Sequence, residues 1–313
     1  MHTRCRLLSL PFRRSLRRGA RWFALLVGGW FLCTGHANAD FNELVVIKSS
    51  DNPYYEQTIT VLARQIDAAI RLHVVNTDQL PVVPPTAEQR RLYIALGSDS
   101  LRRLRASHPE APVVSAYLTL EQYRPLADNR HYAVLLDQPL QRYLAFCKFL
   151  LNLESIGVIE AQPLATYYRL GDTLAQLEIQ LNQFQVDADN KLLPVLRELL
   201  TRNDALLMLP RSALYNRDSL KGVLLTSYRN RKPAISYSPA HVRAGALASI
   251  YSSPNDIGRH LAQVIEQVSA RLEDGFEFAR YYSISSNRRV ARALALTLPD
   301  ESSLRSALDQ VPL

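Results

Sequence analysis

The sequence predicts an α/β protein made of two doubly wound, parallel-sheet lobes. Short apolar runs rich in β-branched residues alternate with segments whose apolar residues recur at helical spacing. That alternation is typical of parallel sheets covered by helices on both faces. Roughly ten such strands in a chain of this length fit two lobes better than a single sheet.

The first half of the predicted fold begins with the run ELVVIKS, which suits a strand buried on both faces. Asp51-Asn52-Pro53 then opens a helix, because proline is favoured in a first turn. The apolar stripe predicted for this helix is Ile59, Leu62, Ile66 and Ile70. The strands predicted in this half span residues 43–49, 72–77, 92–98, 112–118 and 131–137.

The second half repeats the rhythm. Helices are predicted at residues 140–153, 172–184, 191–200 and 216–228. Strands are predicted at residues 155–161, 184–188, 204–210, 233–238 and 246–251. A last long helix follows the stretch RAGALASIYSSPNDIGRHLA, with Ser253 as its N-cap, Pro254 at its first position and Asp256 near the positive dipole end. Its predicted buried stripe is Ile257, Leu261, Val264, Ile265, Val268 and Leu272.

The N-terminus has the pattern of a cleavable export signal. Seven arginines and no acidic residue precede the apolar run of residues 22–33, which is too short to span a bilayer comfortably. Ala37-Asn38-Ala39 is a small-x-small cleavage pattern, so residues 1–39 are predicted to be removed before Asp40. The pair Arg13-Arg14 leaves open whether export is general or of the twin-arginine type.

Removing the leader changes the charge of the chain. The whole sequence has 37 basic and 29 acidic side chains, a net charge of +8, but seven of the basic residues belong to the leader. The mature chain is therefore nearly neutral, at about +1, and we expect no nucleic-acid binding. Only Cys147 remains after cleavage, so no internal disulfide is possible, and its apolar helical context predicts a buried structural thiol.

Signatures of catalysis and of cofactor or metal binding are missing from the sequence. The seven glycines after the leader form no dinucleotide-binding, P-loop or nucleophile-elbow motif. The five histidines after the leader show no close pairing of the kind that binds zinc. We therefore expect no catalytic residue, no cofactor and no metal, and a protein that is not an enzyme.

Polar side chains gather where the predicted strands end. In open α/β sheets, ligands bind beyond the carboxyl ends of the strands, so these residues are the candidate ligand-binding set. Serine and aspartate also cap helices that follow strands, so capping or turn formation is the alternative for each. The candidates are Ser49, Ser50, Asp51, Ser98, Asp99, Tyr117, Asp137, Gln138, Tyr168, Arg211, Ser212, Tyr237 and Tyr251.

The sequence resembles the periplasmic substrate-binding proteins of ABC transporters, in the tryptophan/tyrosine-type branch with the type 1 periplasmic-binding fold. The resemblance rests on four stretches after the leader: VVIKSSDNPYYEQTI, YAVLLDQPLQRYLAFCKFLLNLESIGVIEA, DALLMLPRSALYN, and ISYSPAHVRAGALASIYSSPNDIGRHLAQVI with the tail ISSNRRVARALALTLPDESSL. One departure is Arg211, which follows Pro210 where the family usually has small polar residues.

The resemblance implies two lobes that close over a ligand about a hinge. Residues 40–137 with 253–279 would form one lobe, and residues 138–252 with 280–313 the other, with Tyr251-Ser252-Ser253 at a crossing between them. Three aspartates would face the cleft from one side and two arginines from the other, which suits a ligand with both an amine and an acid group. These are Asp51, Asp99 and Asp137, and Arg169 and Arg211.

The implied function is capture of a small polar, amino-acid-like molecule in the periplasm for an inner-membrane ABC permease, by a monomer. A periplasmic sensing module that reports ligand occupancy to a membrane receptor or kinase uses the same cleft and is the alternative. A periplasmic enzyme is the least favoured interpretation, because no nucleophile, base or metal set is present in the sequence.

Overall fold

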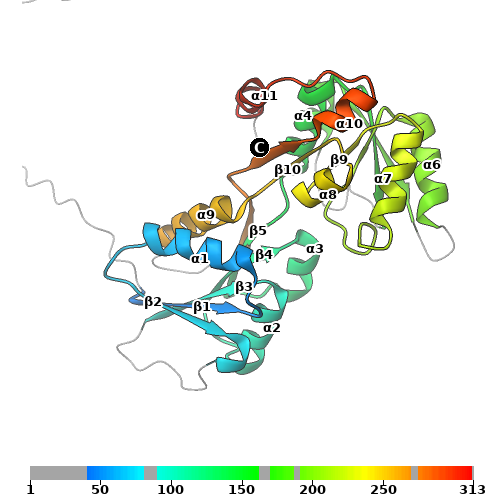
Figure 1. The fold of residues 1–313 in the computed structure, drawn as a ribbon. Helices are drawn as coiled ribbons and strands as arrows, with labels where there is room; N and C mark the ends of the chain where they lie inside the picture. The colour runs from blue at the N-terminus through cyan, green and yellow to red at the C-terminus, as the bar shows by residue number, and fades with distance from the viewer. Residues whose placement is uncertain (1–40, 81–89, 162–169, 187–190, 269–273, 312–313) are drawn as a thin grey trace, which may run out of the picture. The chain divides into compact units, whose positions relative to one another are not determined.

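The computed structural model describes residues 41–80, 90–161, 170–186, 191–268 and 274–311, which form two six-stranded sheets within one compact unit, residues 38–313 (Figure 1). The first sheet is parallel throughout. Its spatial order is β2 (Arg71–Asn76), β1 (Glu43–Lys48), β3 (Arg91–Leu96), β4 (Val113–Leu118), β5 (His131–Leu135) and β11 (Gly275–Phe278).

The second sheet repeats this order. It runs β7 (Gln180–Gln185), β6 (Ser155–Glu160), β8 (Ala205–Leu207), β9 (Ala234–Ser236), β10 (Ala248–Tyr251) and β12 (Ser283–Ser286). Its strands are parallel except β12, which pairs antiparallel with β10. In both sheets the second strand of the half lies outside the first, and the third lies on the other side. The predicted fold class, two doubly wound parallel sheets, is confirmed.

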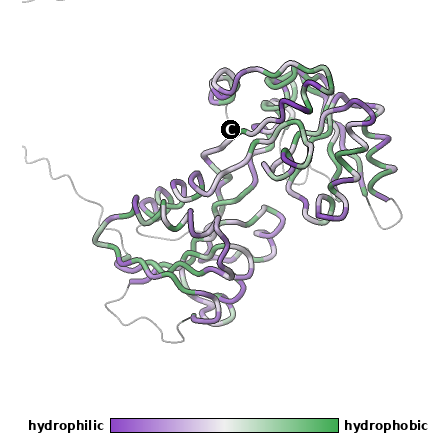
Figure 2. Tube along the Cα trace, viewed as in Figure 1, coloured by the Kyte–Doolittle hydropathy of each residue, from purple (hydrophilic) through white to green (hydrophobic). Residues whose placement is uncertain are grey.

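Helices cover both faces of the first sheet, as the side chains of β1 show. Leu44 and Val46 pack toward α1 (Pro53–Gln65) and α9 (Pro254–Gln267), while Val45 and Ile47 pack toward α2 (Ser98–Ser107) and α3 (Leu120–Tyr123). A strand buried on both faces needs apolar residues at successive positions, and the four central residues of β1, Leu44 to Ile47, supply them. Figure 2 shows this apolar character along the strands of the sheet.

The second sheet is covered in the same way. On one face lie α4 (Leu140–Leu151), α5 (Gly171–Leu177), α10 (Arg288–Ala293) and α11 (Glu301–Leu308); on the other lie α6 (Leu192–Arg202), α7 (Leu220–Arg229) and α8 (Pro239–Ala244). Cys147 of α4 is fully buried in the first of these clusters, as expected, and burial raises the pKa of its thiol.

The start of α9 has the predicted cap. Ser253 Oγ accepts the N–H of Asp256, and Asp256 Oδ2 accepts the N–H of Ser253 in return, with Pro254 at the first helical position. A side chain at Gly258 would lie 2.9 Å from the carbonyl oxygen of Thr58, so glycine is what allows α9 to approach α1 this closely. Figure 1 shows the two helices side by side.

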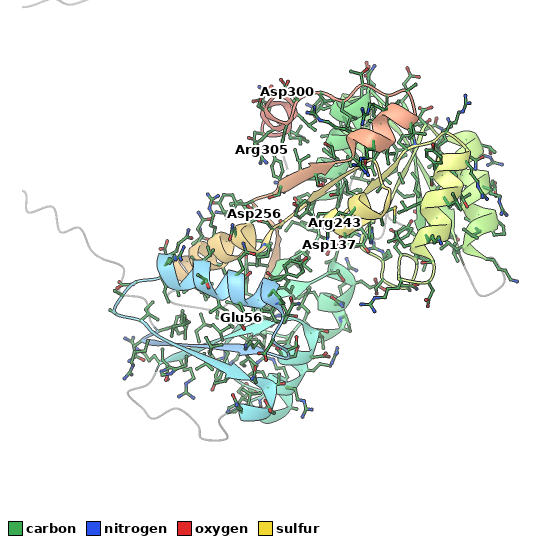
Figure 3. The ribbon with its side chains drawn as sticks, viewed as in Figure 1. Glu56, Asp137, Arg243, Asp256, Asp300 and Arg305 are labelled. Atoms are coloured by element: carbon green, nitrogen blue, oxygen red, sulfur yellow. The ribbon has the colours of Figure 1, made fainter. Side chains whose placement is uncertain are left out.

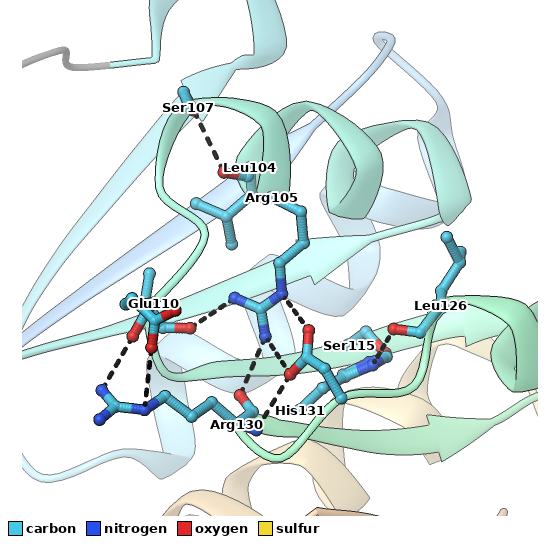
Figure 4. A network of polar contacts seen from close by, with 10 residues as sticks. Leu104, Arg105, Ser107, Glu110, Ser115, Leu126, Arg130 and His131 are labelled. Atoms are coloured by element: carbon cyan, nitrogen blue, oxygen red, sulfur yellow. Dashed lines mark hydrogen bonds and ion pairs between the residues drawn. The ribbon is translucent and has the colours of Figure 1, made fainter.

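The loop that leads into β5 is held by a buried polar network (Figure 4). Arg105 donates two hydrogen bonds to Asp128, from Nε to Oδ2 at 2.6 Å and from Nη2 to Oδ1 at 2.9 Å. Burial lowers the pKa of His131 to about 4, so its ring is neutral at pH 7. Its Nδ1 donates to the carbonyl of Leu126, and its Nε2 accepts from Ser115 at 2.7 Å.

One predicted helix is wrong. The segment at 172–184 is helical only as α5; Glu178 then turns to a left-handed φ of 52°, and β7 follows. Leu174, Leu177, Leu181 and Phe184 have the spacing of a helical stripe, but parallel pairing of β7 with β6 outweighs that local preference. The strand predicted at 184–188 is likewise misplaced, since the strand is Gln180–Gln185. The other predicted elements are present, with ends shifted by up to five residues. The largest shift is in α1, which ends at Gln65, so Ile66 is its C-cap and Ile70 lies beyond the helix. Leu272 lies outside the described residues.

Three segments connect the first sheet with the second, at 136–139, 252–253 and 279–282, and hydrogen bonds join them. Arg142 Nη1 donates to Gln138 Oε1 at 2.6 Å and to the carbonyl of Ala279 at 2.8 Å. Gln138 Nε2 donates to Ser252 Oγ at 2.8 Å, and the Ser252 hydroxyl donates to the carbonyl of Tyr281 at 2.6 Å. Each connecting segment is thereby bonded to its neighbours through side chains.

Candidate ligand-binding site

The strand order creates one switch point in each sheet. Chain connections leave the first and third strands of each half in opposite directions, which opens a crevice at their carboxyl ends. In the first sheet this crevice lies between β1 and β3, and in the second sheet between β6 and β8. These two places are therefore where bound molecules are expected.

The switch point of the first sheet has exposed carboxylates that pair with bases close in sequence. Lys48, the last residue of β1, pairs with Asp51 at 2.8 Å and also with Glu56. The hydrogen bond from Lys48 lowers the pKa of Asp51, whose side chain is 85% exposed. Asp99 pairs with Arg102 one turn along α2. Asp51 and Asp99 are thus engaged with local bases at the surface.

Three serines also lie at the first switch point. Ser49 and Ser50 are exposed directly after β1, and Ser98 is partly buried at the start of α2. Gly97, which precedes it, has a φ of +86°, and a Cβ there would lie 2.6 Å from the hydroxyl of Tyr55. Glycine is required at this turn for both reasons.

The switch point of the second sheet has a buried ion pair instead. Glu160 is the last residue of β6, and Arg211 follows β8. Arg211 Nε donates to Glu160 Oε2 at 2.6 Å, and the two side chains are only 13% and 2% exposed, respectively. Burial raises the pKa of Glu160, while the charge and the hydrogen bond of Arg211 oppose that rise.

The other carboxylate oxygen of Glu160, Oε1, is buried and has no hydrogen-bond partner among the described residues. The same is true of the hydroxyl of Tyr215, which lies close enough to feel the charge of Glu160. Buried polar atoms of native proteins nearly always have a partner, so two orphans beside one ion pair call for an explanation.

Asp137 adds a second buried carboxylate to this region. It lies just after β5 (Figure 3), and its Oδ2 accepts the N–H of Leu120 at 2.8 Å. Burial raises the pKa of Asp137 to about 6, and this hydrogen bond and the positive charge of Arg211 keep it from rising further. Asp137 and Arg211, which were predicted to face a cleft from opposite sides, thus interact electrostatically.

A pocket of about 310 Å³ lies at this switch point. Its volume is at the low end of the range for small-molecule sites, about 300–1,000 Å³. Elements that follow strands of both sheets contribute to its walls, which combine apolar side chains with acids and arginines. The lining residues are Leu120, Glu121, Arg124, Glu160, Ala161, Arg211, Ala213 and Leu214.

None of the other predicted ligand-binding residues in the described part of the chain lines this pocket. Tyr117 has a φ of 62° at an irregularity in β4, and its hydroxyl lies 2.5 Å from Thr58 Oγ1. Gln138 is committed to the segments that connect the sheets, as described above. Ser212 is exposed in a turn. Tyr168 and Arg169 lie outside the described residues.

Two tyrosines are half-buried near the carboxyl ends of the second sheet. Tyr237 packs edge-on against His241 at 4.9 Å, and burial raises its pKa, as does the negative charge of Asp137. Tyr251 ends β10, and burial likewise raises its pKa. Neither tyrosine lines the pocket.

Sequence reasoning missed Glu160 and the lining residues of α3. The strand SIGVIEA was expected to continue to Ala161, so its polar end was sought in the tyrosines that follow. The usable signal was a single carboxylate, Glu160, at the end of an otherwise apolar strand, one residue before the predicted end at Ala161. A charged residue in that position is costly to bury and needs a partner, which Arg211 provides.

Two other hollows are larger, but the buried Glu160–Arg211 ion pair lines neither of them. One, of about 880 Å³, follows the edge strand β7 and α6, and one, of about 700 Å³, lies on α7; no predicted ligand residue lines either. In the described part of the chain, no three His, Cys, Asp or Glu residues gather as a metal site. Within the same residues, no helix has both the length and the apolar character needed to cross a membrane.

The fold is similar to those of several solved structures. An ABC domain from Streptococcus pneumoniae in complex with L-Trp matches with a TM-score of 0.55 and 17% identity over 85% of this chain and 98% of that one. A ligand-free, open substrate-binding protein with adhesive properties from Clostridium difficile matches with a TM-score of 0.61 and 13% identity, over 83% and 97%. A conserved domain protein from Vibrio cholerae matches with a TM-score of 0.55 and 15% identity, over 85% and 97%.

These matches, together with the two sheets of parallel-dominated order, show that the chain has a type 1 periplasmic-binding-protein-like fold. At such low identity they show the fold and nothing finer. No protein-family model matches the sequence, and neither does any curated protein.

Proposed function

We propose that the chain is a periplasmic solute-binding protein of the tryptophan/tyrosine type, which captures a small, amino-acid-like molecule for an ABC uptake system. In this role the protein binds its molecule and hands it to an inner-membrane permease without chemical change. Residues 1–39 serve as a cleaved export signal. The fold supports a binding role, since proteins of similar fold include a domain in complex with L-Trp and a substrate-binding protein.

The observation that carries this proposal is the pocket at the switch point of the second sheet. It is small, its walls come from segments that follow β4, β6 and β8, and it contains a desolvated ion pair. Carboxyl ends of parallel strands from two sheets meeting around one pocket is the arrangement in which open α/β folds bind small ligands.

Closure about the connecting segments completes the proposal. One lobe is residues 40–137 with 253–279, the other residues 138–252 with 280–313, and the hydrogen bonds among Gln138, Arg142 and Ser252 lie where the chain passes between them. Rotation there would bring α3 toward Arg211 and Leu214 and shut the pocket over its occupant.

The test is mass spectrometry of small molecules released from native, full-length protein purified without denaturation. We expect one molecule to be recovered in near-stoichiometric amount. Adding it back to stripped protein should stabilise the fold by about 2.7 kcal/mol at a hundredfold excess over Kd.

A matched pair of variants locates the binding. Ala161 lines the pocket and is exposed, so Ala161→Trp fills the pocket without crowding the core and should abolish recovery of the molecule. Ala106 is an exposed residue of α2, away from the pocket, and Ala106→Trp should leave recovery unchanged. Equal recovery from both variants, or conversion of the added molecule into a product, would contradict the proposal.

A further inference from the structure

The unpartnered oxygen of Glu160 indicates what the pocket binds. Glu160 is 1% exposed, lines the pocket, and leaves Oε1 without a hydrogen-bond partner among the described residues. A buried carboxylate oxygen in this state is costly, and the cost disappears if a donor from a bound molecule occupies the pocket beside it.

Arg211 fixes the position of that oxygen. Its Nε is bonded to Oε2 at 2.6 Å, so the carboxylate is anchored by one oxygen while the other remains for a ligand. A charged, anchored acceptor is preorganised, because it loses little side-chain freedom when a ligand binds. Glu160 Oε1 is therefore suited to accept a hydrogen bond from a ligand, which a salt bridge that only stabilises the fold would not require.

The local charge selects among donors. Glu160 feels the negative charges of Glu121 and Asp137 and the positive charge of Arg211, and Arg124 also lines the pocket. A ligand anion beside Oε1 would add to repulsion among three carboxylates, and a neutral donor would satisfy only the hydrogen bond. A cationic donor both satisfies the bond and offsets the excess of acids around it.

The remaining walls set the body of the ligand. Leu120, Ala161, Ala213 and Leu214 are apolar, and the volume of about 310 Å³ admits a compact molecule. We propose that the pocket takes a small apolar molecule bearing a primary ammonium group, and that Glu160 Oε1 accepts the hydrogen bond of that ammonium. This inference rests on the proposed function, since it names the ligand class of the same site.

Six probes with two apolar bodies test it on the native full-length protein by isothermal titration calorimetry. They are phenethylamine, L-phenylalanine and 3-phenylpropionate, and isopentylamine, L-leucine and 4-methylpentanoate. In at least one of the two series, the phenyl or the branched-alkyl compounds, we expect the amine or the amino acid to bind. The compound of that series that has only a carboxylate should bind about 100-fold more weakly or not detectably. Comparison of the amine with the amino acid shows whether the pocket also takes the acid group.

A substitution then assigns the contact. Glu160→Gln keeps the shape and an acceptor oxygen but removes the charge, and should weaken the amine-bearing probes by roughly 30-fold or more. Glu198→Gln is the matched control, because Glu198 forms a surface ion pair with Arg202 on α6, and it should change affinity less than about twofold. Glu160→Asp, which keeps the charge but withdraws the oxygen, is the second variant if Glu160→Gln does not fold.

Two results would overturn the inference and leave the proposed function standing. One is a carboxylate-only probe that binds as tightly as its amine, and the other is amine binding that Glu160→Gln leaves unchanged. If none of the six probes binds, the inference also falls, and the proposed function is then decided separately by the molecule recovered from native protein.

Discussion

The two sheets share one strand order, yet the carboxylates at their switch points differ in exposure to solvent. In the first sheet Lys48 reaches Asp51 and Glu56, whose side chains are 85% and 51% exposed. In the second sheet Arg211 meets Glu160 at a place from which water is nearly excluded. The same topology thus provides two crevices, and burial of the charged pair, not strand order, distinguishes the one suited to binding.

The energetic consequences of the two pairs differ accordingly. Exposed ion pairs contribute little to stability, because water and salt screen them and the long side chains lose freedom. A buried pair costs desolvation that the mutual attraction hardly repays, but removal of one partner leaves an uncompensated buried charge. A buried pair that adds little stability is therefore better explained by a role in binding, and the following predictions probe that difference.

The largest effect is expected for Arg211→Met. It leaves the carboxylate of Glu160 buried without its cation, and the free energy of unfolding should fall by about 3–5 kcal/mol in urea denaturation. The double variant Glu160→Leu with Arg211→Met removes both charges and should return close to wild-type stability. A double variant as unstable as the single one would show that the ion pair itself stabilises the fold.

The next effect concerns the pH dependence of stability through Asp137. Burial raises the pKa of Asp137 to about 6 from 3.8, so this group favours the folded state fully below pH 4 and loses that contribution as the pH rises through 6. The loss is about 3 kcal/mol. Asp137→Asn retains an acceptor for Leu120 and should raise the free energy of unfolding by about this amount at pH 7.5, with little difference at pH 3.5.

Asp99→Asn in the first sheet is the matched control for that pH series. Asp99 is exposed and paired on its own helix, so its variant should keep the wild-type free energy of unfolding at pH 7.5. Coincident pH profiles for Asp137→Asn and wild type would contradict the burial of Asp137 as a charged group.

A smaller effect is expected where the two sheets are connected. Ser252→Ala removes the acceptor of Gln138 Nε2 and the donor to the carbonyl of Tyr281. The free energy of unfolding should fall by about 1–3 kcal/mol, because Gln138 is left with a buried, unpaired donor. Chemical denaturation checks this, and Ser50→Ala, at an exposed position of the first switch point, is the control expected to behave as wild type.

The smallest effect is expected for Asp51→Asn in the first sheet. Its carboxylate is exposed and bonded to Lys48, so the urea midpoint should not change measurably at physiological salt. A midpoint shift as large as that of Arg211→Met would remove the contrast between the two switch points.

Much of the fold could be predicted from the sequence because its signals are local. The cap at Ser253, the proline that opens α1, and apolar runs such as ELVVIK depend on neighbouring residues alone, and each is present as expected. The segment that became β7 could not be predicted this way. Leu181 and Phe184 continue the helical spacing of the leucines before them, and only pairing with β6 decides between helix and strand.

The site was less predictable, since it depends on which strand ends are buried. Asp137 and Arg211 were identified by their positions after strands, and the structure brings them to one region. Asp51 and Asp99 have the same kind of position but are paired at the surface. Glu160 was missed because no local pattern says that Arg211, about fifty residues later, would meet it.

Small molecules are proposed to bind at the switch point of the second sheet. Hydrogen–deuterium exchange of the native full-length protein, with and without the tightest-binding amine among the six probes, tests it most directly. We expect new protection at residues 118–124, 157–161 and 207–215, around the pocket and the Glu160–Arg211 pair. Protection confined to residues 49–56 and 97–102, at the switch point of the first sheet, would contradict it.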